Sequence, residues 1–117
     1  MAVVFEKTLN ILVFDRDRQL REGLRNFLLT SGYTRVHVIM SIRSALLKLR
    51  QERLDVILLG ASPPIPAVRR LARVAQYRQP AAKIFLLVAA SDQPSFIDVP
   101  DRVILKEYMY SNLLELL

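Results

Sequence analysis

Short continuous apolar runs alternate along this chain with longer segments in which apolar residues recur every three or four positions. The runs have strand length and the longer segments have helical period, so the pattern predicts strand–helix units around a parallel sheet. The first run, Ile11-Leu12-Val13-Phe14, is typical of a strand that is covered on both faces. The predicted strands span residues 10–15, 35–40, 55–60, 83–89 and 102–106.

The same pattern predicts helices at residues 18–30, 42–51, 66–77 and 111–117. Asp17 and Ser41 precede the first two and are placed to cap their free backbone amides. Gly32 suits the left-handed position that follows the first helix. The stretch 91–101 holds Pro94 and Pro100, which leave room for at most one or two helical turns. We therefore expect the helix before the last strand to be shortened or irregular.

With 117 residues and an apolar fraction of 52%, the chain is expected to form a single globular domain over 1–117. No apolar run approaches the ~20 residues of a membrane span, and the N-terminus has no signal-peptide pattern. The absence of cysteine excludes disulfides and thiolate chemistry. We expect a cytoplasmic protein with no membrane association.

The formal net charge is +6, and 13 of the 17 basic residues are arginine. A basic surface attracts nucleic acid, acidic proteins or anionic lipid. Here the basic residues are spread over the first three predicted helices, which favours ordinary solvated helix faces. Arg69, Arg70 and Arg73 form the candidate basic patch if nucleic acid is the partner.

Three segments together make this sequence resemble the receiver domain of two-component response regulators. They are Ile11-Leu12-Val13-Phe14-Asp15-Arg16-Asp17, then the strand that ends at Gly60 and is followed by Pro64, and finally Val103-Ile104-Leu105-Lys106. The resemblance covers essentially the whole chain. It implies a flavodoxin-like (βα)5 sandwich with a parallel sheet of order 2-1-3-4-5. The active crevice of that fold lies at the carboxyl ends of the first, third and fifth strands.

The sequence departs from this family at most positions of the crevice. Gly60 stands where the family has the aspartate that accepts a phosphoryl group, and Arg16 stands where a second carboxylate usually holds Mg²⁺. Val88 replaces the hydroxyl that reads the phosphate, and Val103 replaces a switch aromatic. Asp15 and Lys106 are retained. The resemblance therefore implies a degenerate pseudo-receiver that is not phosphorylated and has no cofactor or metal.

The remaining polar residues of this region have structural interpretations. Asp17 is interpreted as a helix cap rather than a substitute acceptor. Lys106 or Arg16 is expected to pair with Asp15 and to fill the old acidic pocket. His37 is interpreted as an ordinary edge-strand residue, because no acidic or histidine neighbour suggests a metal site.

The leading hypothesis is a phosphorylation-independent interaction or dimerisation module in bacterial signal transduction or transcription regulation, either solitary or fused to an output domain. Its partner, a protein or a second copy, would dock on the face formed by the fourth helix, the fifth strand and the last helix. The alternative is a basic module associated with nucleic acid. An enzyme is not expected, because the sequence has no Ser/His/Asp grouping, phosphate loop or metal cluster. The candidate interface residues are Val103, Tyr108, Tyr110, Leu113 and Leu117.

Overall fold

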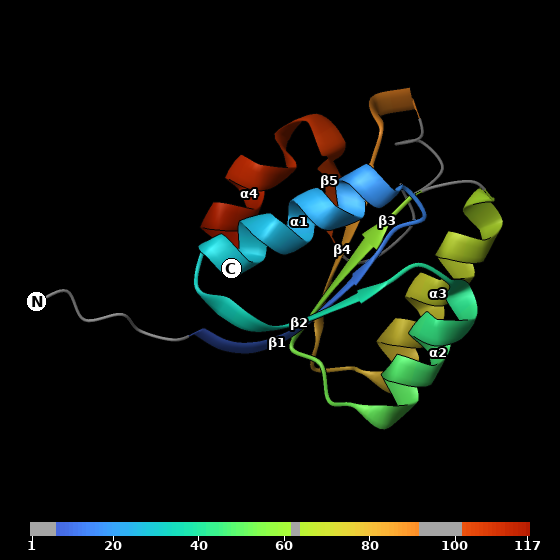
Figure 1. Ribbon diagram of the computed structural model, residues 1–117. Coiled ribbons are helices and arrows are strands. Elements are labelled where there is room, and N and C mark those ends of the chain that lie inside the picture. The colour runs from blue at the N-terminus through green and yellow to red at the C-terminus, as the bar shows by residue number, and fades with distance from the viewer. Residues whose placement is uncertain (1–6, 62–63, 92–101) are drawn as a thin grey trace, which may run out of the picture.

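A computed structural model describes residues 7–61, 64–91 and 102–117. They form a five-stranded parallel sheet of order β2-β1-β3-β4-β5 with helices on both faces (Figure 1). The strands are β1 (Lys7–Phe14), β2 (Tyr33–Ile39), β3 (Val56–Gly60), β4 (Lys83–Val88) and β5 (Arg102–Leu105). The α-helices are α1 (Arg18–Thr30), α2 (Ile42–Gln51), α3 (Ile65–Arg78) and α4 (Met109–Leu116), with a 3-10 turn η2 (Lys106–Tyr108) before α4.

This architecture confirms the predicted flavodoxin-like fold and its strand order. The described residues hold four α-helices, as expected if the helix between β4 and β5 is shortened. Residues 92–101, with Pro94 and Pro100, lie outside the described part of the chain. Among the described residues, no helix has both the length and the apolar character that crossing a bilayer requires.

The predicted helix caps are confirmed. The Asp17 side chain accepts hydrogen bonds from the backbone N–H groups of Gln19 and Leu20, at 3.0 and 3.4 Å. The Ser41 hydroxyl accepts from the N–H of Ser44 at 3.1 Å. Gly32 has a φ of 99°, a left-handed conformation that glycine adopts without steric cost. These local signals set the bounds of α1 and the start of α2.

The sheet separates two apolar clusters. One lies under α2 and α3, and its fully buried members include Leu12, Phe14 and Leu86. The other lies under α1 and α4 and includes Val13, Leu24 and Leu113. Figure 1 shows the two pairs of helices on opposite faces. Because both faces are covered, β1 from Asn10 onward and the whole of β3 are buried, which explains their continuous apolar runs.

The C-terminal helix starts two residues earlier than predicted, at Met109. Leu113, one turn after Met109, is fully buried in the cluster under α1 and α4. Its selection as an interface residue was therefore wrong, because a side chain buried in the core cannot contact a partner. Leu114 instead points outward, with 63% of its surface exposed.

Tyr110 anchors α4 onto α1. Its ring centroid lies 4.9 Å from that of Phe27. Its hydroxyl lies where a side chain on Gly23 would begin, since a Cβ added at Gly23 would be 2.6 Å from that oxygen. The glycine therefore makes room for the tyrosine, and Tyr110 serves intramolecular packing while 40% of its surface stays exposed.

Gln79, just after α3, ties that helix to the end of α2. Its Nε2 donates to the carbonyl oxygens of Leu49 and Glu52, at 2.9 and 2.7 Å. Its Oε1 accepts from the N–H of Leu54 at 3.2 Å. One amide side chain thus satisfies three backbone groups where α2 ends, a place where carbonyl groups lack partners within the helix.

Candidate functional site

The carboxyl ends of β1, β3 and β5 bring Asp15, Gly60 and Lys106 together, as the sequence predicted. Asp15 directly follows β1, Gly60 ends β3, and Lys106 opens the 3-10 turn after β5. In an open parallel sheet, this edge is where ligands and reactive groups are usually placed. We call these three residues the Asp15 crevice.

Asp15 is completely buried, yet only part of its carboxylate is satisfied. Its Oδ1 accepts a hydrogen bond from the backbone N–H of Asp17 at 2.8 Å. Its Oδ2 has no hydrogen-bond partner and lies 3.7 Å from Nζ of Lys106. That distance is an ion-pair contact that is too long for a direct hydrogen bond. Lys106 therefore supplies the counter-charge, which confirms the expected pairing with Asp15.

Gly60 leaves the space that the Asp15 carboxylate fills. A Cβ added to Gly60 would lie 1.7 Å from Oδ2 of Asp15, 2.4 Å from its Cγ and 2.9 Å from its Cβ. Gly60 does not have a positive φ, so a left-handed turn is not the reason for glycine here. The reason is volume, because any side chain at Gly60 would overlap the carboxylate.

Two of the other predicted crevice positions carry buried or partly buried apolar side chains. Arg16 is exposed. The Arg21 guanidinium donates to the backbone oxygens of Asp15 and Arg16, at 2.9 and 3.3 Å. Val88 is fully buried in the cluster under α2 and α3, and Val103 packs partly buried against that cluster. Both valines thus serve the core.

The residues of the Asp15 crevice do not fit a magnesium ion. Mg²⁺ requires near-octahedral oxygen coordination and is usually held by one or two carboxylates. Here Asp15 supplies the one carboxylate, and its free oxygen already faces the Lys106 ammonium group. A dication at that oxygen would lie beside a positive charge. No group of three or more potential metal ligands occurs among the described residues.

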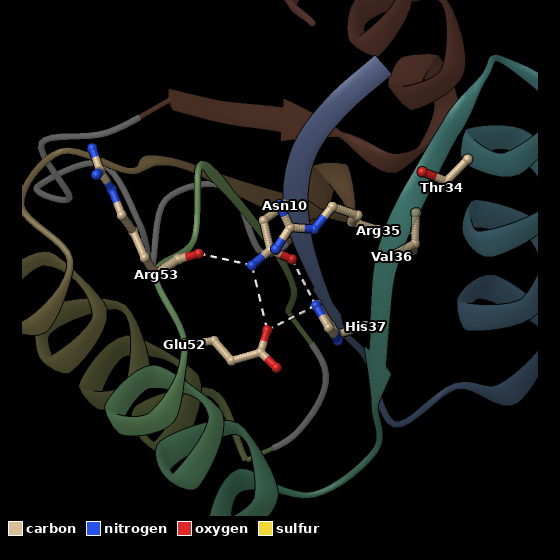
Figure 2. Close-up of a pocket in the computed structure, with 7 residues that line it drawn as sticks. All are labelled: Asn10, Thr34, Arg35, Val36, His37, Glu52 and Arg53. Atoms are coloured by element: carbon tan, nitrogen blue, oxygen red, sulfur yellow. Dashed lines mark hydrogen bonds and ion pairs between the residues drawn. The ribbon is translucent and has the colours of Figure 1, made fainter. Parts of the chain in front are cut away.

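A second polar cluster, which the sequence did not indicate, lies at the other end of the sheet (Figure 2). His37 of β2 places its Nε2 2.6 Å from Oδ1 of Asn10 and 2.9 Å from Oε2 of Glu52. Nδ2 of Asn10 donates to the backbone oxygen of Arg53 at 2.7 Å, which fixes the orientation of that amide. Interpreting His37 as a residue without an acidic neighbour was therefore wrong. Glu52 follows α2, 15 positions later, and tertiary folding brings it to β2.

The hydrogen-bond pattern defines the tautomer of His37. Both atoms that face Nε2 are acceptors, so Nε2 carries the hydrogen and further protonation takes place at Nδ1. Burial lowers the pKa of His37 below its ordinary value, and the Glu52 carboxylate opposes that shift. Lys48 and Arg35 lower this pKa further through their positive charges. The neutral imidazole is therefore the form that the folded protein favours.

The candidate interface and basic residues lie on separate surfaces. Tyr108 is 58% exposed, while Leu117 packs partly buried against the cluster under α1 and α4. On the other side of the sheet, Pro66 and the three arginines of the candidate basic patch line a hollow of about 340 Å³ on α3. Tyr77, also on α3, is 83% exposed.

Comparison with solved structures identifies the fold. TrrA of Thermotoga maritima, a response regulator solved in complex with Mg²⁺-BeF, superposes with a TM-score of 0.78 at 27% identity, covering 92% of this chain and 95% of that one. A CheY-like receiver domain protein from Methanospirillum hungatei gives 0.75 at 20% identity, covering 93% and 90%. The receiver domain of a sensor histidine kinase from Pseudomonas aeruginosa, with magnesium in its cleft, gives 0.76 at 19% identity, covering 94% of each chain.

The chain therefore has the fold of response regulator receiver domains, which suggests a role in two-component signalling. No protein-family model matches the sequence, and no curated protein matches it. This chain and the receiver domains thus share a fold at low sequence identity, through a similar pattern of buried positions.

Proposed function

We propose that this domain is a pseudo-receiver that acts in bacterial signal transduction or transcription regulation as a binding module and not as an enzyme. It would bind a protein partner or a second copy of itself, without being phosphorylated. The observation that supports this most directly is the contact between Gly60 and Asp15. Gly60, which the family resemblance places at the phosphoryl acceptor, has no side chain, and a buried carboxylate fills the adjacent space.

Neither remaining aspartate near the crevice is suited to replace the missing acceptor. A carboxylate nucleophile has to reach phosphorus, and a metal or cation has to neutralise the phosphoryl oxygens. Asp15 is fully buried and held by Asp17 N–H and Lys106. Asp17 is engaged in capping α1. The Asp15 carboxylate is also paired with the Lys106 ammonium group, and a phosphodonor would not change this pairing.

Incubation with acetyl phosphate and Mg²⁺, followed by intact-mass spectrometry, tests the loss of phosphorylation. We expect no gain of a phosphoryl group. An Asp15→Asn variant and an Asp17→Asn variant serve as controls. A phosphorylated species that disappears in either variant would refute the proposal and identify the acceptor.

The proposed docking surface lies around η2 and α4. Tyr108 and Leu114 are 58% and 63% exposed there, and Tyr110 is 40% exposed beside them. Exposed apolar groups gathered on one face mark interaction sites more often than scattered ones do. Lys106, which pairs with Asp15, opens the 3-10 turn that carries Tyr108.

Light scattering of the wild type and of a Leu114→Glu variant tests self-association. Leu47→Glu is the matched control, because Leu47 is a 46% exposed leucine on α2, across the sheet. If a dimer forms, Leu114→Glu should weaken it and Leu47→Glu should not. A wild type that is monomeric at ~100 μM, well above the micromolar range that corresponds to about −8 kcal/mol, would exclude self-association and leave a different protein as the partner.

A second candidate function is nucleic-acid binding through α3. The hollow lined by Arg69, Arg70 and Arg73, with exposed Tyr77 on the same helix, combines positive charge with an aromatic ring, as single-strand binders do. Fluorescence anisotropy with a labelled single-stranded oligonucleotide tests it. Binding that falls steeply with salt, and that is lost in the Arg70→Gln/Arg73→Gln variant, would favour this function.

A further inference from the structure

A hollow of about 440 Å³ lies beside the Asn10–His37–Glu52 cluster, away from the Asp15 crevice (Figure 2). Asn10 precedes Asp15 by five positions along β1, and at 3.3 Å per residue this separates the two places by about 17 Å. The hollow is therefore a separate feature. Its volume falls within the range of small-molecule sites. It is lined by Asn10, Thr34, Arg35, Val36, His37, Glu52 and Arg53.

The floor of this hollow is held in place by hydrogen bonds. Asn10 is 3% exposed, and its backbone N–H donates to Oδ2 of Asp55 at 2.8 Å. Its side chain contacts His37 and the Arg53 carbonyl, as described above. The pairing of β1 with β2 shifts register between Lys7 and Asn10. Such irregularities re-aim side chains and often occur beside functional sites.

The charges around the hollow leave a positive excess. Glu52 is the one acidic residue in the lining, and its charge is already matched by Nζ of Lys48 at 3.1 Å. Arg35 and Arg53 are exposed. Within the described part of the chain, no salt bridge is formed by either guanidinium group. Two guanidinium groups therefore remain available, one from β2 and one from the connection between α2 and β3.

We propose that this hollow binds a small organic anion with two or more carboxylate or phosphate groups, through the guanidinium groups of Arg35 and Arg53. Arginine binds both kinds of group with paired, charge-assisted hydrogen bonds. Figure 2 shows the Arg35 guanidinium beside Asn10, whereas the exposed side chain of Arg53 extends outward from the far side of the hollow and would swing inward to contact a ligand. A ligand with two anionic ends could contact both. This inference does not depend on the proposed signalling role.

NMR titration of the full chain with citrate and, separately, with inorganic pyrophosphate tests the proposal and distinguishes the carboxylate from the phosphate class. Both probes are used without divalent metal. The side-chain amide of Asn10 and the ring of His37 are the reporters. We expect saturable shifts at both reporters with at least one probe. Arg35→Gln and Arg53→Gln should each weaken binding about tenfold, as expected for the loss of a charged hydrogen bond.

Arg25→Gln is the matched control, since Arg25 is an exposed arginine on α1, on the opposite face of the sheet. It changes the net charge equally and should leave the affinity within about twofold. Circular dichroism checks that each variant is folded. Shifts that rise linearly without saturation for both probes would overturn the proposal. Equal weakening by Arg25→Gln would do so too, because it would mean diffuse charge attraction.

Discussion

Replacing Gly60 with alanine inserts a methyl group into the space of the Asp15 carboxylate. The new Cβ would lie 1.7 Å from Oδ2 and 2.4 Å from Cγ of Asp15. The side chain of Asp15 would have to turn away, and it would lose the hydrogen bond from Asp17 and the ion pair with Lys106. Overpacking of this kind costs about 1–3 kcal/mol, and a lost hydrogen bond to a charged group costs about 1.5–3 kcal/mol.

A smaller effect opposes this cost. Glycine in a strand is less favourable than alanine by about 0.5–1 kcal/mol, because it loses more conformational entropy on folding. The net expectation is a free energy of unfolding lowered by about 3 kcal/mol. In an Asp15→Ala background the two nearest atoms are absent and only the 2.9 Å contact with Cβ remains. There, Gly60→Ala should cost no more than about 1 kcal/mol.

Urea denaturation followed by circular dichroism measures this double-mutant cycle. The expected coupling between the two sites is about 2 kcal/mol. Gly32→Ala is the control, because its cost of about 1–2 kcal/mol arises from the left-handed backbone and should be equal in both backgrounds. A coupling below about 0.5 kcal/mol, within the range of independent sites, would refute the explanation of Gly60 by volume.

Further predictions concern the second polar cluster and the contact between α2 and α3. The pKa of His37 is lowered in the folded protein from 6.5, so the unfolded chain binds the proton more readily, and the contribution of His37 to stability is lost as pH falls below about 6.5. The pKa of Glu52 is also lowered, chiefly by its hydrogen bond with Lys48. Its contribution to stability is therefore also lost as pH falls, but at more acidic pH than that of His37. Urea denaturation at a series of pH values below 7 should show the free energy of unfolding falling as the solution becomes more acidic. The His37→Gln variant should lose the part of this decrease that lies just below pH 6.5. An unchanged pH profile in that variant would show that His37 is not its cause. Gln79→Leu removes partners from three backbone groups and should lower the free energy of unfolding by about 2–3 kcal/mol, whereas a cost below about 0.5 kcal/mol in urea denaturation would show that water replaces these bonds.

The sequence predicted most of the elements, because their signals are local. The bounds of α1 and α2 follow from a capping side chain and an apolar stripe that lie within a few positions of each other. The Asp15 crevice could also be predicted, since parallel strands bring their carboxyl ends to one edge. The order of the strands came from the family resemblance and not from periodicity.

The predictions that failed concern contacts between distant segments or the exact phase of a helix. Glu52 and His37 are in contact because the C-terminal end of α2 lies beside β2 in the folded chain. The residues near them in the sequence do not indicate this contact. The C-terminal helix was expected at Ser111, but it begins at Met109. In this helix Leu113 faces the core and Leu114 faces outward. The clash of a side chain at Gly60 with Asp15 also depends on how two strands sit beside each other, which the sequence alone does not give.

The close fit between Gly60 and Asp15 also constrains how this domain could evolve. A mutation of Gly60 to aspartate alone would bring a second carboxylate against the one that fills this space, with steric overlap and charge repulsion together. The first step toward a second carboxylate at this edge of the sheet would therefore reduce stability before it offered any function. A change at Asp15 would have to come first or at the same time. While Asp15 keeps its present position, single substitutions at position 60 are disfavoured, and glycine is retained there.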